Sequence, residues 1–298
     1  MSYQSTFTLT VPAPTPFDFH SAARAHGWVA LRPFEWHEPD LELRRVHQLN
    51  TGQVVRLRVS EEDKALQVQI DAGQPLTAAD EAEIRQAVQR MLRLDEDLSE
   101  FYQFQAEMGE RWSLRLQPGG GRLLRCPTLF EDIVYTICTT NINWAGTKRM
   151  VERITLKFGT AHPGQPDWIA FPRPEVLAAT DVEFLQRETG LGYRSAYVWA
   201  LASAVTEGRL HLSSLEDPIL PADELLKALR QIKGIGPYGA ATLMMILGRY
   251  EHLAIDSELR AHVSRKYLNG QRPTDAQIQA IYEPWGRWRY LAYWFDTP

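Results

Sequence analysis

The chain has 298 residues, of which 44% are hydrophobic and 23% are charged, and its formal net charge is −5. This length provides for two domains with separate cores, and the composition excludes a disordered chain. No segment reaches the roughly 18 consecutive apolar residues that a membrane span requires, and the first residues lack the basic and apolar pattern of a signal peptide. We therefore expect a folded, soluble, cytoplasmic protein.

Cysteine and histidine usage limits the metal and redox chemistry. The only cysteines are Cys126 and Cys138, and the eight histidines are scattered along the chain. Two cysteines exclude a disulfide framework and a four-cysteine zinc or iron–sulfur site within this chain. No histidine, cysteine or carboxylate cluster has the spacing of metal ligands. The sequence therefore predicts two buried thiols and no catalytic transition metal.

The first hundred residues show the short alternating runs that are typical of antiparallel strands. These runs are FTLTV at 7–11, WVAL at 28–31, LELRRVHQL at 41–49, VVRLRV at 54–59 and LQVQI at 66–70. A helical pattern follows at 78–94, where apolar residues recur every three or four positions. We expect a strand-rich α+β domain over residues 1–97.

From residue 98 onward the pattern is helical. The predicted helices cover 98–108, 129–141, 144–158, 193–205, 222–232 and 240–250. The glycine-rich PGGGR around Gly120 is predicted to be an exposed hairpin or linker, and 162–174 a proline-rich loop between helices. We expect a mainly helical second domain over residues 98–298, whose C-terminal helix can pack back on the first domain.

Acidic residues are concentrated in one part of the chain. Residues 61–110 hold 13 acidic and 4 basic side chains, a net charge of −9, which leaves +4 on the remainder. Residues 227–266 hold seven basic and three acidic side chains. This distribution permits phosphate binding around 227–266, although an ordinary solvated surface explains it as well.

The segment KGIGPYGAATLMMILGRYEHLAIDSELR at 233–260 combines a glycine turn with a single later aspartate. Gly234 and Gly236 can turn one helix sharply into the next, which leaves free amide groups and the positive end of the dipole at the second helix. Such a helix start holds a phosphate, but a simple capping turn also explains the pattern. Asp256 either caps the helix that begins at SELR or supplies a carboxylate for catalysis.

The whole phrase resembles the helix-hairpin-helix DNA glycosylase superfamily, in which an aspartate about 20 residues after a G-[IV]-G hairpin is catalytic. Further segments at 100–104, 136–159, 190–205 and 282–294 look like helices of oxoguanine glycosylases. The strand-rich first domain is similar in pattern to the accessory sheet domain of those enzymes and of bacterial 3-methyladenine glycosylase II. The resemblance covers most of residues 98–295.

This resemblance implies roles for particular residues. Asp256 would stabilise the positive charge that develops on the sugar as the N-glycosidic bond breaks, or orient or deprotonate the attacking water. Tyr193 matches an aromatic wedge, Arg194 a contact to the estranged base, and Asn141 a gap-filling residue, with Ile142 as an apolar alternative. Read without the family, Tyr193 and Ile142 would be core residues.

Departures from the family pattern are equally informative. The lysine that forms a Schiff base in strand-cleaving members is replaced by Tyr238, which predicts a monofunctional hydrolytic enzyme. The pocket residues on the last helix are replaced by Tyr290 and Trp294, and an arginine that reads the opposite cytosine is replaced by Gly146. Tyr238, Tyr290 and Trp294 are therefore the predicted base pocket.

Aromatic residues also suggest the kind of base. The cluster Trp285, Trp288, Tyr290, Tyr293 and Trp294 could form an electron-rich cleft that suits cationic alkylated purines such as 3-methyladenine. Core packing explains several of these rings equally well. An oxidised or deaminated base, including 8-oxoguanine, is the alternative substrate, and a noncatalytic DNA-binding protein is the alternative class.

The hairpin is predicted to contact DNA. Its candidate phosphate-binding residues are Lys233, Gly234, Gly236 and Gly239. The resemblance further implies a structural monovalent cation, Na⁺ or K⁺, on the backbone carbonyls of Arg230, Ile232 and Ile235. We expect no cofactor for the chemistry, damaged double-stranded DNA as the partner, a monomer, and association with the nucleoid through DNA.

Overall fold

The computed structural model describes residues 5–108, 112 and 116–296. Contacts divide the chain into two compact units, Met1–Asp95 with Pro118–Leu212 and Glu96–Gln117 with Ser213–Pro298. The first unit holds an antiparallel sheet and several helices, and the second is helical, which confirms the predicted α+β class. Residues 118–212 share a compact unit with the sheet, and the two-domain division after residue 97 stays a prediction.

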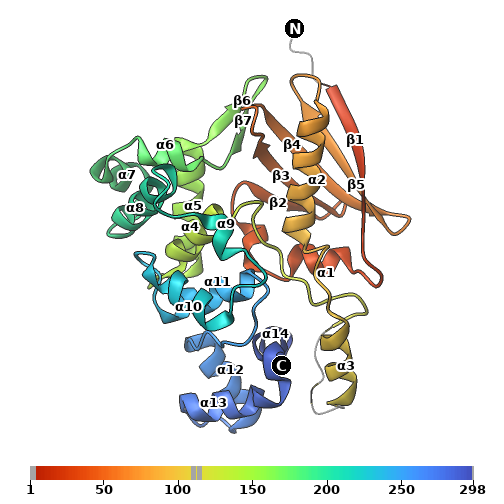
Figure 1. Ribbon diagram of the computed structural model, residues 1–298, viewed down its shortest axis with the longest axis vertical. Coiled ribbons are helices and arrows are strands. Elements are labelled where there is room, and N and C mark those ends of the chain that lie inside the picture. The colour runs from red at the N-terminus through yellow and green to blue at the C-terminus, as the bar shows by residue number, and fades with distance from the viewer. Residues whose placement is uncertain (1–4, 109–111, 113–115, 297–298) are drawn as a thin grey trace. The chain divides into compact units, whose positions relative to one another are not determined.

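The sheet of the first unit has five antiparallel strands in the order β1-β5-β4-β3-β2. Its strands are β1 (Ser5–Pro12), β2 (Phe34–His37), β3 (Glu42–Gln48), β4 (Val54–Glu62) and β5 (Ala65–Ala72). Burial alternates along β3 and β4, as expected for strands with one covered face. Helix α2 (Ala78–Leu92), which begins with a Thr77–Asp80 capping box, lies along this sheet (Figure 1).

The structure corrects one predicted strand. Residues 28–30 belong to a 3₁₀ turn, η1 (Gly27–Ala30), which Leu31 caps and which follows the short helix α1 (Phe19–Arg24). Trp28 and Leu31 are both buried and lie three residues apart, which is the 3₁₀ period and not the two-residue period of a strand. The strand β2, which the sequence analysis did not predict, follows this turn.

Five helices and a hairpin complete the first unit. They are α4 (Leu129–Thr139), α5 (Trp144–Phe158), α6 (Pro174–Ala178), α7 (Val182–Thr189), α8 (Arg194–Thr206), β6 (Thr160–His162) and β7 (Gln165–Ala170). The predicted proline-rich loop at 162–174 is wrong in part, since β6 and β7 pair across it. The tryptophan and isoleucine after its turn supply the strand residues that the prolines concealed.

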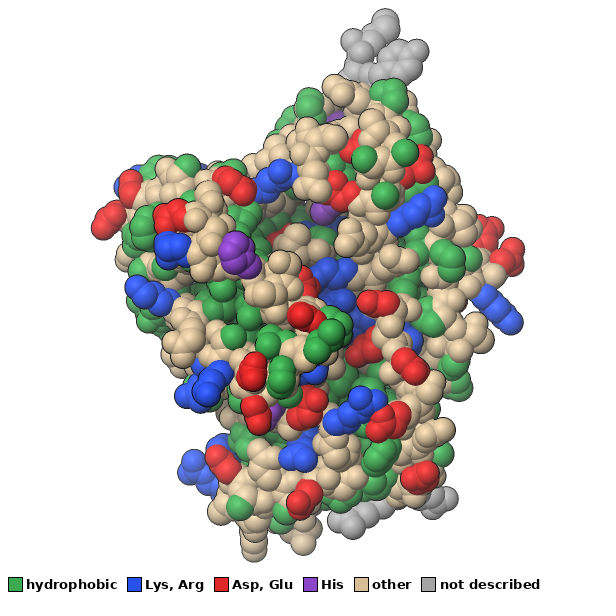
Figure 2. Space-filling model, in the orientation of Figure 1, with side chains coloured by type: hydrophobic (Ala, Val, Ile, Leu, Met, Phe, Trp, Pro, Cys, Tyr) green, Lys and Arg blue, Asp and Glu red, His purple; other side chains and the backbone are tan. Residues whose placement is uncertain are grey.

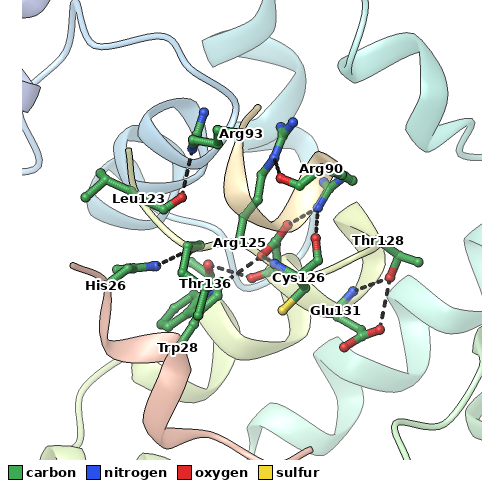
Figure 3. A network of polar contacts seen from close by, with 12 residues as sticks. His26, Trp28, Arg90, Arg93, Leu123, Arg125, Cys126, Thr128, Glu131 and Thr136 are labelled. Carbon is green, nitrogen blue, oxygen red and sulfur yellow. Dashed lines mark hydrogen bonds and ion pairs between the residues drawn. The ribbon is translucent and has the colours of Figure 1, made fainter. Parts of the chain in front are cut away.

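A buried polar network ties α2, η1 and α4 together (Figure 3). The carboxylate of Asp132, which is fully buried on α4, accepts from Trp28 Nε1 at 3.0 Å, from Cys126 N at 2.9 Å and from Arg90 Nη1 at 3.0 Å. Because each of these donors comes from a different segment, one carboxylate fixes where α4 starts. Both cysteines are buried free thiols, as predicted.

The glycine-rich segment around Gly120 is buried, so its prediction as an exposed hairpin or linker is wrong. Gly119 has a φ of +88°, and a Cβ there would lie 2.6 Å from the backbone of Phe17. Its carbonyl accepts from Asp18 N at 3.2 Å. Glycine is needed here for a close approach of two backbones, which composition alone does not distinguish from a flexible linker.

The second unit is built from helices. They are α3 (Ser99–Glu107), α9 (Leu212–Leu215), α10 (Ala222–Gln231), α11 (Pro237–Ile246), α12 (Ser257–Tyr267), α13 (Asp275–Tyr282), the 3₁₀ helix η3 (Glu283–Trp288) and α14 (Arg289–Phe295). Phe101 of α3 packs against Trp285 and Trp288, with ring centroids 5.7 and 5.6 Å apart. These two tryptophans are buried core residues, which decides between the two explanations offered for them. Among the described helices, none is long and apolar enough to cross a bilayer.

Candidate functional site

The predicted hairpin joins α10 to α11 in the second unit. Gly234 has a φ of +88°, where other residues are strained, whereas Gly236 has a φ of −84° and open space where a Cβ would stand. Ile235 between them is buried and donates its N–H to Ile232 O at 3.0 Å. Backbone geometry therefore requires a glycine at 234 only, and the glycine at 236 leaves the turn open to a ligand.

The first turn of α11 has backbone N–H groups without hydrogen-bond acceptors among the described residues. Pro237 stands at its first position and has no N–H. The N–H groups of Tyr238 and Gly239 donate to no acceptor within the described part of the chain. Lys233 is exposed just before the turn, and Gly239 is buried. This is the arrangement of an anion site at a helix N-terminus.

On the face drawn in Figure 2, basic and acidic side chains are interspersed, so charge alone marks no phosphate-binding surface there. The case for a phosphate site therefore rests on the geometry of the hairpin amides.

The carbonyls predicted to hold a cation differ in their existing bonds. Ile232 O accepts a hydrogen bond from the Ile235 N–H. Among the described residues, no backbone N–H of the turn or of α11 donates to Arg230 O or to Ile235 O. Oxygen-only ligands suit hard cations, so these residues fit Na⁺ or K⁺.

Asp256 is the N-cap of α12 and is half-buried. Its Oδ1 accepts from Glu258 N at 3.0 Å and from Leu259 N at 2.8 Å. Its Oδ2 accepts no hydrogen bond from any described residue. Asp256 therefore caps the helix with one oxygen and keeps the other available, so the capping and catalytic interpretations are compatible.

Three tyrosines, Tyr238, Tyr290 and Tyr293, lie around Asp256, and we call them the phenol cluster. Burial raises the pKa of each phenol, and the nearby Asp256 carboxylate raises it further. Tyr290 is buried and stacks on Tyr293 with centroids 6.0 Å apart, while Tyr238 is 36% exposed. The three phenols therefore stay protonated at neutral pH and lie close enough to Asp256 to respond to its charge.

The structure brings the predicted base-pocket residues together. Trp294 is half-buried and meets Tyr290 edge-on at 6.4 Å, and Tyr238 is close enough to Tyr290 to raise its pKa. The sequence analysis did not assign Thr242, which stands one helical turn after Tyr238 on α11. Its spacing of four residues from Tyr238 was the available signal.

A separate cavity of about 510 Å³ lies in the second unit. It is lined by Pro221, Ala222, Asp223, Glu251, His252, Leu253, Gln279 and Arg289. Neither Asp256 nor the phenol cluster contributes to it, so it is not the predicted base pocket.

The predicted wedge residues form an exposed group in the first unit. Tyr193 is 52% exposed and Ile142 is 42% exposed, so the alternative of core packing is wrong for both. Asn141 has a φ of +49° and donates from Nδ2 to Tyr193 Oη at 3.3 Å. These three residues come from two separate loops and meet at one point on the surface.

Arg194 has a different setting from the wedge. It is buried and donates to Thr140 Oγ1 and Leu191 O, each at 3.3 Å, and also to Thr140 O. Its guanidinium carbon lies 4.6 Å from the centre of the Tyr193 ring. Arg194 thus supports Tyr193, and the predicted contact with an estranged base would require some of these bonds to break.

The structure explains why residue 146 is a glycine. A Cβ at this position would lie 2.4 Å from Ile142 Cγ1, so the Ile142 side chain rests directly on the glycine. An arginine here would displace Ile142. The glycine that departs from the family pattern at 146 therefore makes room for the exposed side chain of Ile142.

The chain has the fold of the helix-hairpin-helix DNA glycosylases, as the resemblance stated above implied. A 3-methyladenine DNA glycosylase from Archaeoglobus fulgidus superposes with a TM-score of 0.77 at 22% identity, covering 96% of this chain and 97% of the other. An 8-oxoguanine glycosylase/lyase from Clostridium acetobutylicum, in complex with double-stranded DNA, superposes with a TM-score of 0.62 at 16% identity over 91% of each chain.

Sequence comparison finds relatives that carry the same kind of name as the first of these structures. A DNA-3-methyladenine glycosylase of Bacillus subtilis is 26% identical over 218 residues, which is 70% of each chain. Two further relatives with 3-methyladenine glycosylase names are matched over little more than half of their length. The chain matches no protein-family model.

Proposed function

We propose that this protein is a monofunctional DNA glycosylase that extrudes a damaged base from double-stranded DNA and hydrolyses its N-glycosidic bond, with alkylated purines such as 3-methyladenine as substrates. The observation that carries this proposal is the free Oδ2 of Asp256, which caps α12, the next helix after the α10–α11 hairpin, and lies near the phenol cluster. The relatives named as 3-methyladenine glycosylases support the choice of base.

The chemistry follows from the carboxylate. As the bond between C1′ and the base nitrogen breaks, its electron pair leaves with the base and positive charge develops on the sugar. A carboxylate whose other oxygen is tied to two backbone amides is held in place, so little reorganisation is needed to stabilise that charge. Water then adds to C1′ and gives up a proton.

This protein is not expected to cleave the DNA strand. A lyase requires an amine to form a Schiff base with the sugar, and the residue in that position is Tyr238. Lys233 precedes the turn and is exposed, where we assign it to the DNA phosphate together with the free amides of α11. A monovalent cation on the carbonyls of Arg230, Ile232 and Ile235 would brace the same turn.

The exposed wedge group has the chemistry of a gap filler. An extruded base leaves a hole in the stack, which a planar or apolar side chain can occupy. Tyr193 and Ile142 are the exposed candidates, and Asn141 ties to Tyr193 through its amide. We propose that the protein acts in this way as a monomer.

Asp256→Asn tests the mechanism cleanly. Asparagine caps a helix as well as aspartate does, so the variant keeps the fold and loses only the charge. We expect base release to fall by at least about 100-fold while DNA binding is retained. The assay is release from duplexes carrying 3-methyladenine, 1,N6-ethenoadenine, hypoxanthine, uracil or 8-oxoguanine, with and without alkali.

Asp181→Asn is the matched control. Asp181 caps α7 by accepting from Phe184 N at 2.6 Å, and it lies in the other unit. It should release bases at the native rate. Unchanged release by Asp256→Asn would contradict the catalytic assignment, and strand breaks without alkali would contradict the monofunctional one. Salt-sensitive DNA binding without release of any base would favour the noncatalytic class.

A further inference from the structure

Thr242 is a buried hydroxyl that the surrounding protein does not use. It is 6% exposed on α11, where its neighbours in sequence are apolar or small. Its Oγ1 has no hydrogen-bond partner within the described residues. A buried polar atom without a partner reduces stability, and in native proteins such atoms are uncommon.

The other buried threonines behave differently. Thr136, Thr155 and Thr189 each donate to the carbonyl four residues earlier, at 2.8, 2.9 and 2.6 Å. Thr147 donates to Cys138 O at 3.0 Å. A helical threonine normally satisfies its hydroxyl in this way. Thr242 Oγ1 makes no such bond to the carbonyl of Tyr238.

Tyr238 of the phenol cluster stands one turn before Thr242 on α11, so the two side chains are neighbours on one helix face. The Thr242 hydroxyl is near enough to Tyr238 and Tyr290 to oppose the rise in pKa of both phenols. Asp256 acts on the same two phenols. Thr242 therefore lies beside the two phenols that, under the proposed function, line the base pocket.

The leaving base sets what such a hydroxyl can do. An N7-methylated or N3-methylated purine carries a positive charge and departs neutral when it takes the electron pair of the broken bond. An uncharged purine such as hypoxanthine departs with a negative charge, which spreads over its ring nitrogens and exocyclic oxygen. Hydrogen-bond donors at those atoms favour departure of the uncharged base far more than departure of the cationic one.

We infer that Thr242 is a specificity-determining residue, whose hydroxyl together with the O–H groups of Tyr238 and Tyr290 donates to the departing base and extends the substrates to uncharged purines. This inference rests on the proposed function. The bond between C1′ and N9 breaks, its electron pair stays on the purine, and the donors stabilise the resulting anion until it is protonated by water.

The test compares Thr242→Val with Thr242→Ser. Valine keeps the shape and removes the hydroxyl, and serine keeps the hydroxyl. The substrates are duplexes that carry either hypoxanthine or N7-methylguanine at the same position. We expect Thr242→Val to lower kcat/KM for hypoxanthine by about tenfold or more, with less than about a threefold change for N7-methylguanine, and Thr242→Ser to resemble the native enzyme on both.

Stability provides an independent readout. Since the Thr242 hydroxyl has no partner, Thr242→Val should unfold at the native temperature or above it. Thr155→Val is the matched control, because it removes a satisfied buried hydroxyl. It should lower the unfolding temperature and leave the ratio of the two base-release rates unchanged.

Each outcome has a distinct meaning. An equal fall on both substrates, a fall with Thr242→Ser as large as with Thr242→Val, or native release of N7-methylguanine without hypoxanthine would overturn the inference and leave the proposed function standing. Release of neither base by the native protein would contradict the proposed function, and the inference with it.

Discussion

Asp256 shows how one side chain can have two roles. Its Oδ1 is committed to the amides of Glu258 and Leu259, and its Oδ2 remains free. The cap holds the carboxylate in position, so the structural role serves the proposed chemical one. Substitutions can separate the two, because asparagine preserves the cap and alanine does not.

Asp256→Ala is therefore expected to lower the free energy of unfolding by about 1 kcal/mol, the usual cost of a lost N-cap. Asp256→Asn should change it by less than about half of that. Urea unfolding of both variants measures the difference. Equal destabilisation by the two substitutions would show that the charge, and not the capping geometry, stabilises α12.

At the scale of elements, the hairpin depends on the backbone of a single residue. Gly234 has a positive φ, and Gly236, two residues later, does not. The turn positions the amides of Tyr238 and Gly239 at the start of α11. Any strain in the turn therefore displaces the proposed phosphate donors along with the fold.

Gly234→Ala should destabilise the protein by about 1–2 kcal/mol, the cost of a left-handed backbone for a residue with a Cβ. Gly236→Ala is the control, since an added Cβ meets nothing within 4 Å and the φ is ordinary. Its stability should stay within about 0.5 kcal/mol of the native value. Thermal and urea unfolding would decide, and equal stability of the two variants would contradict the assignment.

At the scale of the whole molecule, a buried histidine makes stability depend on pH. His26 donates from Nδ1 to Leu124 O at 2.9 Å, and burial lowers its pKa from 6.5 to about 4. Between these values the unfolded chain binds the proton more strongly than the folded one. Stability should therefore fall as the pH is lowered from 6.5, and the loss should level off near pH 4 at about 3 kcal/mol.

His26→Asn removes the titrating group and keeps an N–H donor near the Nδ1 position. Its stability should vary less with pH across this window than that of the native protein. Urea unfolding at several pH values measures the slope, with tryptophan fluorescence as a local signal because the Trp28 ring lies 4.2 Å from that of His26. Equal slopes in the two proteins would contradict this assignment.

Local patterns predicted many of the longer elements. Alternation identified four of the five strands of the large sheet, and the three to four residue period identified α2, α3, α4, α5, α8, α10 and α11. The predictions for residues 28–31 and for the segment around Gly120 were wrong because contacts with distant residues determine these structures. The buried Trp28 donates a hydrogen bond to Asp132, over 100 residues away, and Gly119 packs against the backbone of Phe17.

The sequence by itself determined the α+β class, the hairpin and the position of Asp256, because periodicity, glycine turns and motif spacing are written in adjacent residues. Only the tertiary structure decided which oxygen of Asp256 is free, which aromatic rings belong to the core, and that the hydroxyl of Thr242 is left without a partner among the described residues. These outcomes depend on side chains brought together from α11, α12 and α14, and no local pattern records which atoms such packing leaves without a partner.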